Sequence, residues 1–448
     1  MNITHPPGRS LHPFGKFTHP LLAALCVATA SSIPSSADSL LIRNVTLHPV
    51  SEPVLTNASL LVRDGRITAL GTVNDTADKT VDATGLHLFP GLIAAATVLG
   101  LQEIEAVRAT RDTTEVGDYT PDVKAWIAVN PDSELIPVAR ANGITHAQVI
   151  PMGGIVSGWS GVIALDGWTT EDLAIRREVG LHLNWPSQVL DTTPKSMVPG
   201  KDKWKSPEDQ AKERDKKLKE INDFFDDAEA YARTRDAASV STAFGTVPAW
   251  EAMLPAIRRE KPLWIHANEL RQIRSALEWA ARRKLSAVLV GGRDAWRCAE
   301  LIASNRVSVV LEHVYTLPAR DTDPYDVHFA SAAVLTKAGV HVIFGEGTDR
   351  FGASNLRNLP YSAAQALAYG LSREEALKGI TLYPAQAMGI ADQLGSLELG
   401  KAATFFLATG DILDVRSRVL RVWINGRETS VETRHTRLYD RYKNRPKP

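Results

Sequence analysis

This 448-residue chain has few cysteines, no excess of either charge and no long apolar run. It contains only Cys26 and Cys298. Its 51 basic residues equal its 51 acidic residues, which argues against a nucleic-acid or anionic-membrane partner. The apolar run at 21–28 is shorter than the about 20 residues of a membrane-spanning helix. Hydrophobic residues make up 44% of the chain, which is enough for a large folded core.

The first 37 residues have the pattern of a secretory signal peptide. Two basic residues precede the apolar run, and small residues end at Ala37. A membrane anchor and a lipoprotein anchor at Cys26 are the alternatives. Cleavage after Ala37 would leave Cys298 as the one cysteine and 51 − 2 = 49 basic residues against 51 acidic ones. We therefore expect an exported protein of a bacterial periplasm, without an internal disulfide and not bound to the membrane after cleavage.

Short runs of strand-forming residues occur at both ends of the expected mature chain. Residues 38–89 contain three such runs, and Asp64-Gly65 between two of them is a hairpin signal. Residues 395–430 contain two more, and 431–448 form a tail. This pattern predicts one small β-sandwich domain assembled from 38–89 and 395–430.

Between them, residues 90–394 alternate β-branched apolar runs with amphipathic helical segments. Predicted strands include His146–Ile150, Leu263–His266, Ala287–Val290, Val307–Leu311 and Val340–Phe344, and predicted helices include Arg271–Arg283 and Ala295–Ala303. Such alternation over this length predicts an α/β fold with a parallel (β/α)8 barrel.

A charged segment, 201–236, interrupts this alternation. Its apolar residues Leu218, Ile221, Phe224 and Phe225 have helical spacing. We expect a solvated helical insertion from one barrel loop, and a lid over the active site is the alternative.

Three motifs resemble the amidohydrolase superfamily. Val81–Gly85 leading into Pro90–Ile93 resembles its entry to the barrel, Thr381–Gly389 its last helix, and Leu394–Ala403 its exit turn. Within that superfamily the chain is most similar to exported imidazolonepropionase-like proteins. The resemblance implies a barrel that binds one or two divalent metal ions beside a β-sandwich. It also implies a metal-bound water that attacks the substrate.

The metal-binding motif of the superfamily is degenerate in this sequence. The family places an Asp and a His-x-His pair at the end of the first barrel strand, where this chain has Ala94, Ala96 and Val98. Residues two apart share one face of a strand, so the family pair can hold one metal ion. Alkyl side chains cannot coordinate a metal, so these three positions are lost ligands.

The resemblance identifies a residue at some of the other ligand positions and none at others. His266 matches the ligand on the fifth strand, and no histidine stands at the sixth. His313 is a candidate substitute, with a structural hydrogen-bonding role as its alternative. Asp349 resembles the catalytic carboxylate of the eighth strand, with a loop Asx turn as its alternative.

Other polar groups are candidates for the same end of the barrel. A Gly-rich loop at 151–161 offers backbone N–H groups, and Gly153, Gly154 and Ser157 are candidate substrate-binding residues. Glu103, Asp112 and Glu115 follow the degenerate motif, either as solvated acids or as a source of one oxygen ligand.

We expect a hydrolase that cleaves a non-peptide C–N bond, such as a cyclic amide, in a small-molecule substrate. One divalent metal ion, zinc by preference, would be its cofactor. The alternative is a catalytically inactive binding protein of the periplasm that keeps the barrel and binds no metal. A third hypothesis is metal-independent hydrolysis, with Asp349 and His266 or His313 as the acid/base pair. The oligomeric state stays open, with a homo-oligomer among the alternatives.

Overall fold

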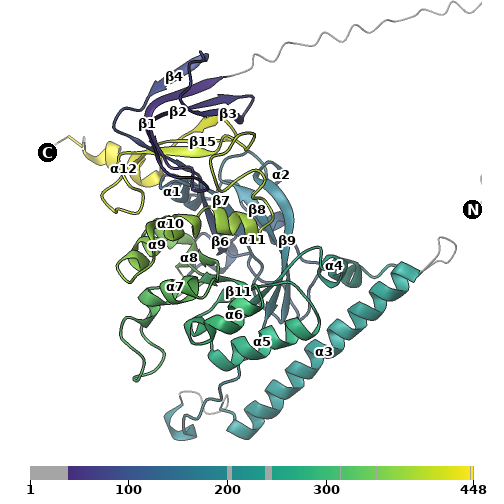
Figure 1. The fold of residues 1–448 in the computed structure, drawn as a ribbon. Helices are drawn as coiled ribbons and strands as arrows, with labels where there is room; N and C mark the ends of the chain where they lie inside the picture. The colour runs from purple at the N-terminus through teal and green to yellow at the C-terminus, as the bar shows by residue number, and fades with distance from the viewer. Residues whose placement is uncertain are drawn as a thin grey trace, which may run out of the picture. The chain divides into compact units, whose positions relative to one another are not determined.

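The computed structural model describes residues 39–198, 204–237, 245–312, 314–349, 351–443 and 445–446. The predicted signal peptide and His313 lie outside these described residues. The chain from residue 39 onward builds two eight-stranded sheets, one of which curls into a nearly closed barrel (Figure 1).

The first sheet, here called the terminal sheet, combines strands from both ends of the chain, as predicted. It places the C-terminal strand β14 beside the N-terminal strand β5, and the Asp64-Gly65 hairpin joins β2 to β3. These strands form one continuous sheet. Its strands are β1 (Leu40–Leu47), β2 (Leu55–Arg63), β3 (Arg66–Gly71), β4 (Lys79–Asp82), β5 (His87–Pro90), β14 (Phe405–Ala408), β15 (Val419–Ile424) and β16 (Arg427–Thr429).

The second sheet forms the predicted barrel, with its strands in chain order. The last strand, β13, lies close to the first, β6. Directly after β13, a Cβ placed on Gly345 would lie 3.5 Å from the carbonyl oxygen of Ala95 on β6. The strands are β6 (Leu92–Thr97), β7 (Ile144–Val149), β8 (Val156–Ala164), β9 (Ala174–Asn184), β10 (Leu263–Ala267), β11 (Ala287–Gly291), β12 (Ser308–Leu311) and β13 (Val342–Phe344).

One barrel strand differs from the expected parallel arrangement. β8 pairs antiparallel with both β7 and β9, whereas the other neighbouring pairs are parallel. Only residues 150–155 connect β7 to β8, and a parallel crossover needs a dozen or more residues. The expectation of a loop as far as residue 161 is therefore wrong, because the chain is already in β8 from Val156 onward.

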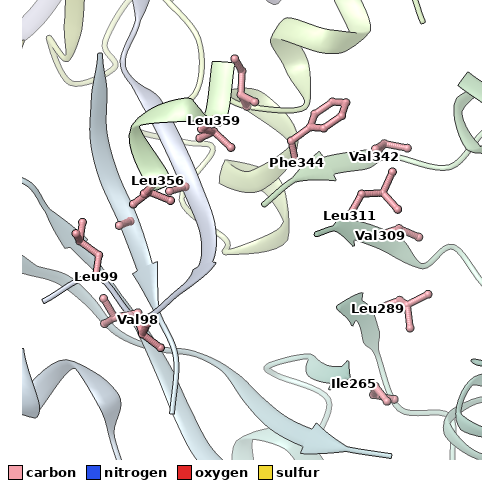
Figure 2. Close-up of a cluster of buried hydrophobic side chains, with 14 of the residues drawn as sticks. Val98, Leu99, Ile265, Leu289, Val309, Leu311, Val342, Phe344, Leu356 and Leu359 are labelled. Atoms are coloured by element: carbon pink, nitrogen blue, oxygen red, sulfur yellow. The ribbon is translucent and has the colours of Figure 1, made fainter. Parts of the chain in front are cut away.

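Two hydrophobic clusters define the two faces of the barrel. Trp264, Val288, Val310 and Ile343 come from four successive strands and pack in one cluster, which must therefore fill the barrel interior. Their neighbours along the chain face outward, toward the helices. Figure 2 shows these outward side chains, from Ile265 on β10 to Phe344 on β13, in one cluster with Leu359 of the outer helix α9 (Leu359–Leu367).

Helices cover the barrel from outside, and Figure 1 shows α5, α6 and α7 following one another around it. The predicted helix Arg271–Arg283 is observed as α5, and the predicted helix Ala295–Ala303 as a 3-10 turn followed by α6. The remaining helices are α1 (Leu135–Arg140), α2 (Thr170–Leu173), α4 (Pro248–Ile257), α5 (Leu270–Arg282), α6 (Ala299–Ser304), α7 (Val327–Lys337), α8 (Gly352–Asn355), α10 (Arg373–Lys378), α11 (Leu382–Ala387) and α12 (Arg434–Lys443).

The charged insertion forms one long helix, α3 (Pro207–Ala237). Phe225 is fully buried and packs edge-on against Trp279 of α5, with ring centroids 4.8 Å apart. Trp279 donates a hydrogen bond from Nε1 to Asn222 of α3 at 3.0 Å, and Arg283 pairs with Asp226 at 2.7 Å. The helix is therefore held along the outer side of α5. Among the described residues, none of the helices has the length and apolar character of a membrane span.

Candidate active site

The end of β6, where the family motif is degenerate, is packed with alkyl side chains. Ala94, Ala96 and Val98 are all fully buried. Ala94 and Val98 belong to the outer cluster and Ala96 to the interior one, because the pairing of β6 with β7 shifts register between Ala94 and Thr97. Ala96 itself has a left-handed φ of +49°. Positions 96 and 98 therefore do not share a face, contrary to the expectation from a regular strand, and Figure 2 shows Val98 among the outer cluster.

Polar side chains of the barrel interior between β6 and β9 bond to one another. Gln148 on β7 accepts a hydrogen bond from the Ala96 N–H at 3.1 Å and donates one to Ser160 on β8 at 2.9 Å. Ser160 donates onward to the Gly180 carbonyl at 3.2 Å. Gly180 is required here, because a Cβ at this position would lie 2.0 Å from the Trp264 ring. Gln148 and Ser160 thus bond to each other and to the backbone of β6 and β9, whereas the Nε1 of Trp264 is buried without a partner among the described residues.

His266 lies on β10 two residues after Trp264 and so faces the interior. Its Nε2 is 2.9 Å from Nδ1 of His182 on β9. Burial lowers the pKa of His266 to about 4, and burial together with His266 lowers the pKa of His182 well below its usual range. Both rings are therefore neutral at pH 7 and share one hydrogen bond.

The described residues do not fit a metal centre of the family type. The Nε2 of His266 is engaged by His182, and Ala96 and Val98 offer no donor atom. In the part of the chain that the structure describes, no three His, Cys, Asp or Glu side chains gather closely enough to hold a metal ion. The proposed ligand role of His313 stays a prediction, because His313 lies outside the described residues.

The candidate substrate-binding residues lie between β7 and β9. Gly153 and Gly154 are in the connection before β8 and have φ values of +82° and +62°. Ser157, on β8, donates to the Gly153 carbonyl at 2.5 Å and accepts from Asn184 Nδ2 at 2.9 Å. Asn184 also bonds to the Gly154 carbonyl at 3.1 Å. These polar groups hold the loop together, and their role toward a substrate stays a prediction.

Glu312 lies at the carboxyl end of β12, and one of its carboxyl oxygens lacks a hydrogen-bond partner among the described residues. It lies two residues after Val310 and therefore faces the interior, and its Oε1 is buried with no hydrogen-bond partner among the described residues. Its side chain runs beside the next strand end, because a Cβ on Gly345 would lie 3.6 Å from Glu312 Cγ. Burial, followed by the charge of Asp349, raises the pKa of Glu312 to about 8. At neutral pH this carboxyl is mostly protonated.

Glu346 and Asp349 follow β13, and Asp349 interacts electrostatically with both Glu346 and Glu312. Burial raises the pKa of Glu346 to about 7, against the hydrogen bond that Ser362 donates to it at 2.5 Å. Asp349 is exposed, and its carboxylate accepts from the Phe351 N–H at 3.0 Å in an Asx turn. The charge of Asp349 raises the pKa of both glutamates. Perturbed acids at the carboxyl ends of barrel strands are typical of catalytic sites.

The structure groups the predicted site residues in two places. His266 pairs with His182, whereas Asp349 joins Glu312 and Glu346. The sequence analysis selected Asp349, and Glu312 adjoins the substitute ligand position at His313. It assigned no role to Glu346, although Glu346 lies two residues beyond a predicted strand, at the end where barrel active sites lie. Glu103 has a buried Oε1 without a partner among the described residues.

Two imidazolonepropionases are similar to this chain. The imidazolonepropionase of Cupriavidus necator is 26% identical over 403 residues, which cover 86% of this chain and 92% of that protein. The imidazolonepropionase of Pseudomonas putida is 24% identical over 366 residues, covering 79% of this chain and 86% of that protein. The similarity is distant and extends over most of the chain.

Solved structures share the fold. An amidohydrolase from Thermotoga maritima MSB8 superposes with a TM-score of 0.74 at 26% identity, covering 87% of this chain and 99% of that one. A Xanthomonas campestris adenosine deaminase with bound zinc superposes with a TM-score of 0.50 at 19% identity, covering 87% and 92%. The sequence model of the amidohydrolase family matches residues 171–429. This chain, with its barrel and its terminal sheet, belongs to the amidohydrolase family.

Proposed function

We propose that the protein hydrolyses a non-peptide C–N bond, such as that of a cyclic amide, in a small substrate bound at the carboxyl end of the barrel. Family membership and the similarity to imidazolonepropionases support this class of reaction. One observation carries the proposal for this chain: Glu312, with a pKa of about 8, lies in the field of the Asp349 carboxylate. Glu312 can therefore donate a proton near neutral pH, beside a second carboxyl group that can accept one.

The two carboxyl groups divide the chemistry as follows. Asp349 takes a proton from a water molecule as the water oxygen attacks the substrate carbonyl carbon. Glu312 gives its proton to the leaving nitrogen as the C–N bond breaks, so the products are a carboxylic acid and an amine. The proton on Asp349 then returns to Glu312 for the next turnover. General acid and general base catalysis each contribute about 10²- to 10⁴-fold in rate.

In the family, a divalent metal would polarise the carbonyl and activate the water. The zinc-bound relative shows that the shared fold can hold such an ion. In this chain the described residues do not supply the ligands, so the polarisation would come from the protonated Glu312.

A second candidate function is a binding protein without catalysis. It is favoured by the packing at the end of β6, where Ala94, Ala96 and Val98 leave no donor toward a metal or a substrate. Such a protein would bind the same class of ligand at the same end of the barrel and release it unchanged.

The test is turnover of a panel of cyclic amides and N-acylated amino acids by the mature chain, residues 38–448, with and without a chelator. We expect hydrolysis that survives the chelator, declines above pH about 8 as Glu312 ionises, and is lost in Glu312→Gln. Activity that the chelator abolishes and zinc restores would establish the metal mechanism and give His313 its predicted role. Ligand binding without any turnover would establish the binding protein.

We also propose that the protein is exported to the periplasm, from the signal-like pattern of residues 1–37. N-terminal sequencing of the protein recovered from its native host tests this. A mature N-terminus at Asp38 is expected, and a retained Met1 would contradict it.

A further inference from the structure

A cavity of about 680 Å³ opens among the segments that follow four neighbouring barrel strands. Gln188 follows β9, Leu270 follows β10, Arg293 follows β11 and Arg320 follows β12, and all four line it. The segments after the carboxyl ends of barrel strands build the ligand-binding face of this fold. The volume is in the range of cavities that hold small-molecule ligands.

The lining of this cavity is strongly basic, in a chain with no net charge overall. Five arginines and two acids line it, for a formal charge of 5 − 2 = +3. The arginines are Arg214, Arg271, Arg293, Arg297 and Arg320, and the acids are Glu269 and Asp294.

Both acids are already committed to other groups. Asp294 accepts from Arg320 at 2.8 and 3.1 Å and from the Leu270 N–H at 3.1 Å. Glu269 accepts from the Ser187 hydroxyl at 3.0 Å and from the Val189 N–H at 3.2 Å. These bonds fix the segments after β9, β10 and β12 around the cavity, and among the described residues neither acid forms an ion pair with Arg271, Arg293 or Arg297.

Three of the arginines lack an acidic partner. Among the described residues, no carboxylate forms an ion pair with Arg271, Arg293 or Arg297. The Nε of Arg293 is buried and has no hydrogen-bond partner in the described part of the chain. A buried donor without a partner destabilises the fold unless a ligand or water satisfies it.

We propose that this cavity binds a phosphate group, carried by a small ligand or free in solution. A guanidinium presents a planar fork of donors that matches phosphate oxygens, and three such forks from two neighbouring segments suit a group with several acceptor oxygens. A lining charge of +3 favours a dianion over a single carboxylate. The site does not depend on the hydrolysis proposed above.

Calorimetric titration of the mature chain tests the proposal, at one ionic strength and in a buffer without phosphate. The probes are diphosphate, inorganic phosphate and glycerol 3-phosphate, with malonate as a dicarboxylate of comparable charge. We expect diphosphate binding that weakens about tenfold in Arg293→Gln and in Arg271→Gln. Arg418→Gln is the matched control, because it removes one exposed arginine of the terminal-sheet region outside the cavity.

The outcomes separate clearly. Tight binding of glycerol 3-phosphate alone would identify an organic phosphate as the ligand, and equal binding of inorganic phosphate would identify the free ion. Malonate binding as tightly as diphosphate, or equal losses in Arg418→Gln and the cavity variants, would overturn the proposal. Arg271→Gln, on the exposed first turn of α5, keeps the test decisive if Arg293→Gln fails to fold. Glu312→Gln should bind phosphate normally, which separates this site from the proposed hydrolysis.

Discussion

Replacing Glu312 by Gln should change how the stability of the protein depends on pH. The wild-type carboxyl has an ordinary pKa of 4.5 when unfolded and a pKa of about 8 in the folded protein, because burial and the charge of Asp349 disfavour its ionised form. Between these values the folded state holds a proton that the unfolded state has released. The contribution of the Glu312 carboxyl to the unfolding free energy is therefore fully present below pH 4.5 and is lost as the pH rises through about 8.

The magnitude follows from the size of the shift. Each unit of pKa difference corresponds to about 1.4 kcal/mol, so between pH 5 and pH 9 the wild type should lose about 4 kcal/mol of unfolding free energy through Glu312. Gln is uncharged in both states and contributes no such loss. The unfolding free energy of wild type minus that of Glu312→Gln should thus fall by about 4 kcal/mol between pH 5 and pH 9.

Urea unfolding followed by tryptophan fluorescence at pH 5, 7 and 9 measures this difference. Glu346 titrates in both proteins, so its contribution cancels in the comparison. Glu278→Gln, at an exposed position of α5, controls for the loss of an ordinary carboxylate. If wild type and Glu312→Gln lose stability in parallel within about 1 kcal/mol, the carboxyl is not buried as described and its proposed role as an acid fails.

Three further substitutions test the packing around the site. His266→Ala should lower the unfolding free energy by about 2–3 kcal/mol in urea titrations, because its buried histidine partner on β9 loses its hydrogen bond; a change below 1 kcal/mol would contradict the pair. Phe225→Ala should cost about 3–5 kcal/mol, since α3 would lose its contact with Trp279, and limited proteolysis should then cut α3 first. Gly180→Ala should lower the melting temperature, because its methyl group would overlap the Trp264 ring; an unchanged melting temperature would contradict the packing of the interior.

The fold could be predicted from the sequence because its signals are local. The Asp64-Gly65 hairpin and the apolar run at 263–266 depend on residues that are neighbours in the chain. β8 was missed because its glycines resemble a loop. Gly161 is needed there because a Cβ would lie 2.9 Å from the Trp126 side chain, a contact between distant segments that no local pattern reveals.

The site could be predicted only in part, because its chemistry depends on contacts between distant residues. His266 was identified by its place at the end of a strand, but its partner His182 is 84 residues away in the chain. Glu312 stands beside the residue that was selected, His313, and its sequence context does not distinguish a solvated acid from a buried one. Its raised pKa arises from burial and from Asp349, which only the folded chain brings together.

Two of the unsatisfied buried polar groups lie at the sites proposed for this barrel. The interior between β6 and β9 closes on itself through Gln148 and Ser160. Among the described residues, the buried polar atoms without partners include Arg293 Nε after β11 and Glu312 Oε1 after β12, and others lie elsewhere, such as His182 Nε2 on β9. Each such group destabilises the free protein by about 1–3 kcal/mol, and a bound ligand can recover that free energy. Glu312 belongs to the proposed hydrolytic site and Arg293 to the proposed phosphate site, so a ligand at either place would recover part of the free energy that the burial of these groups costs.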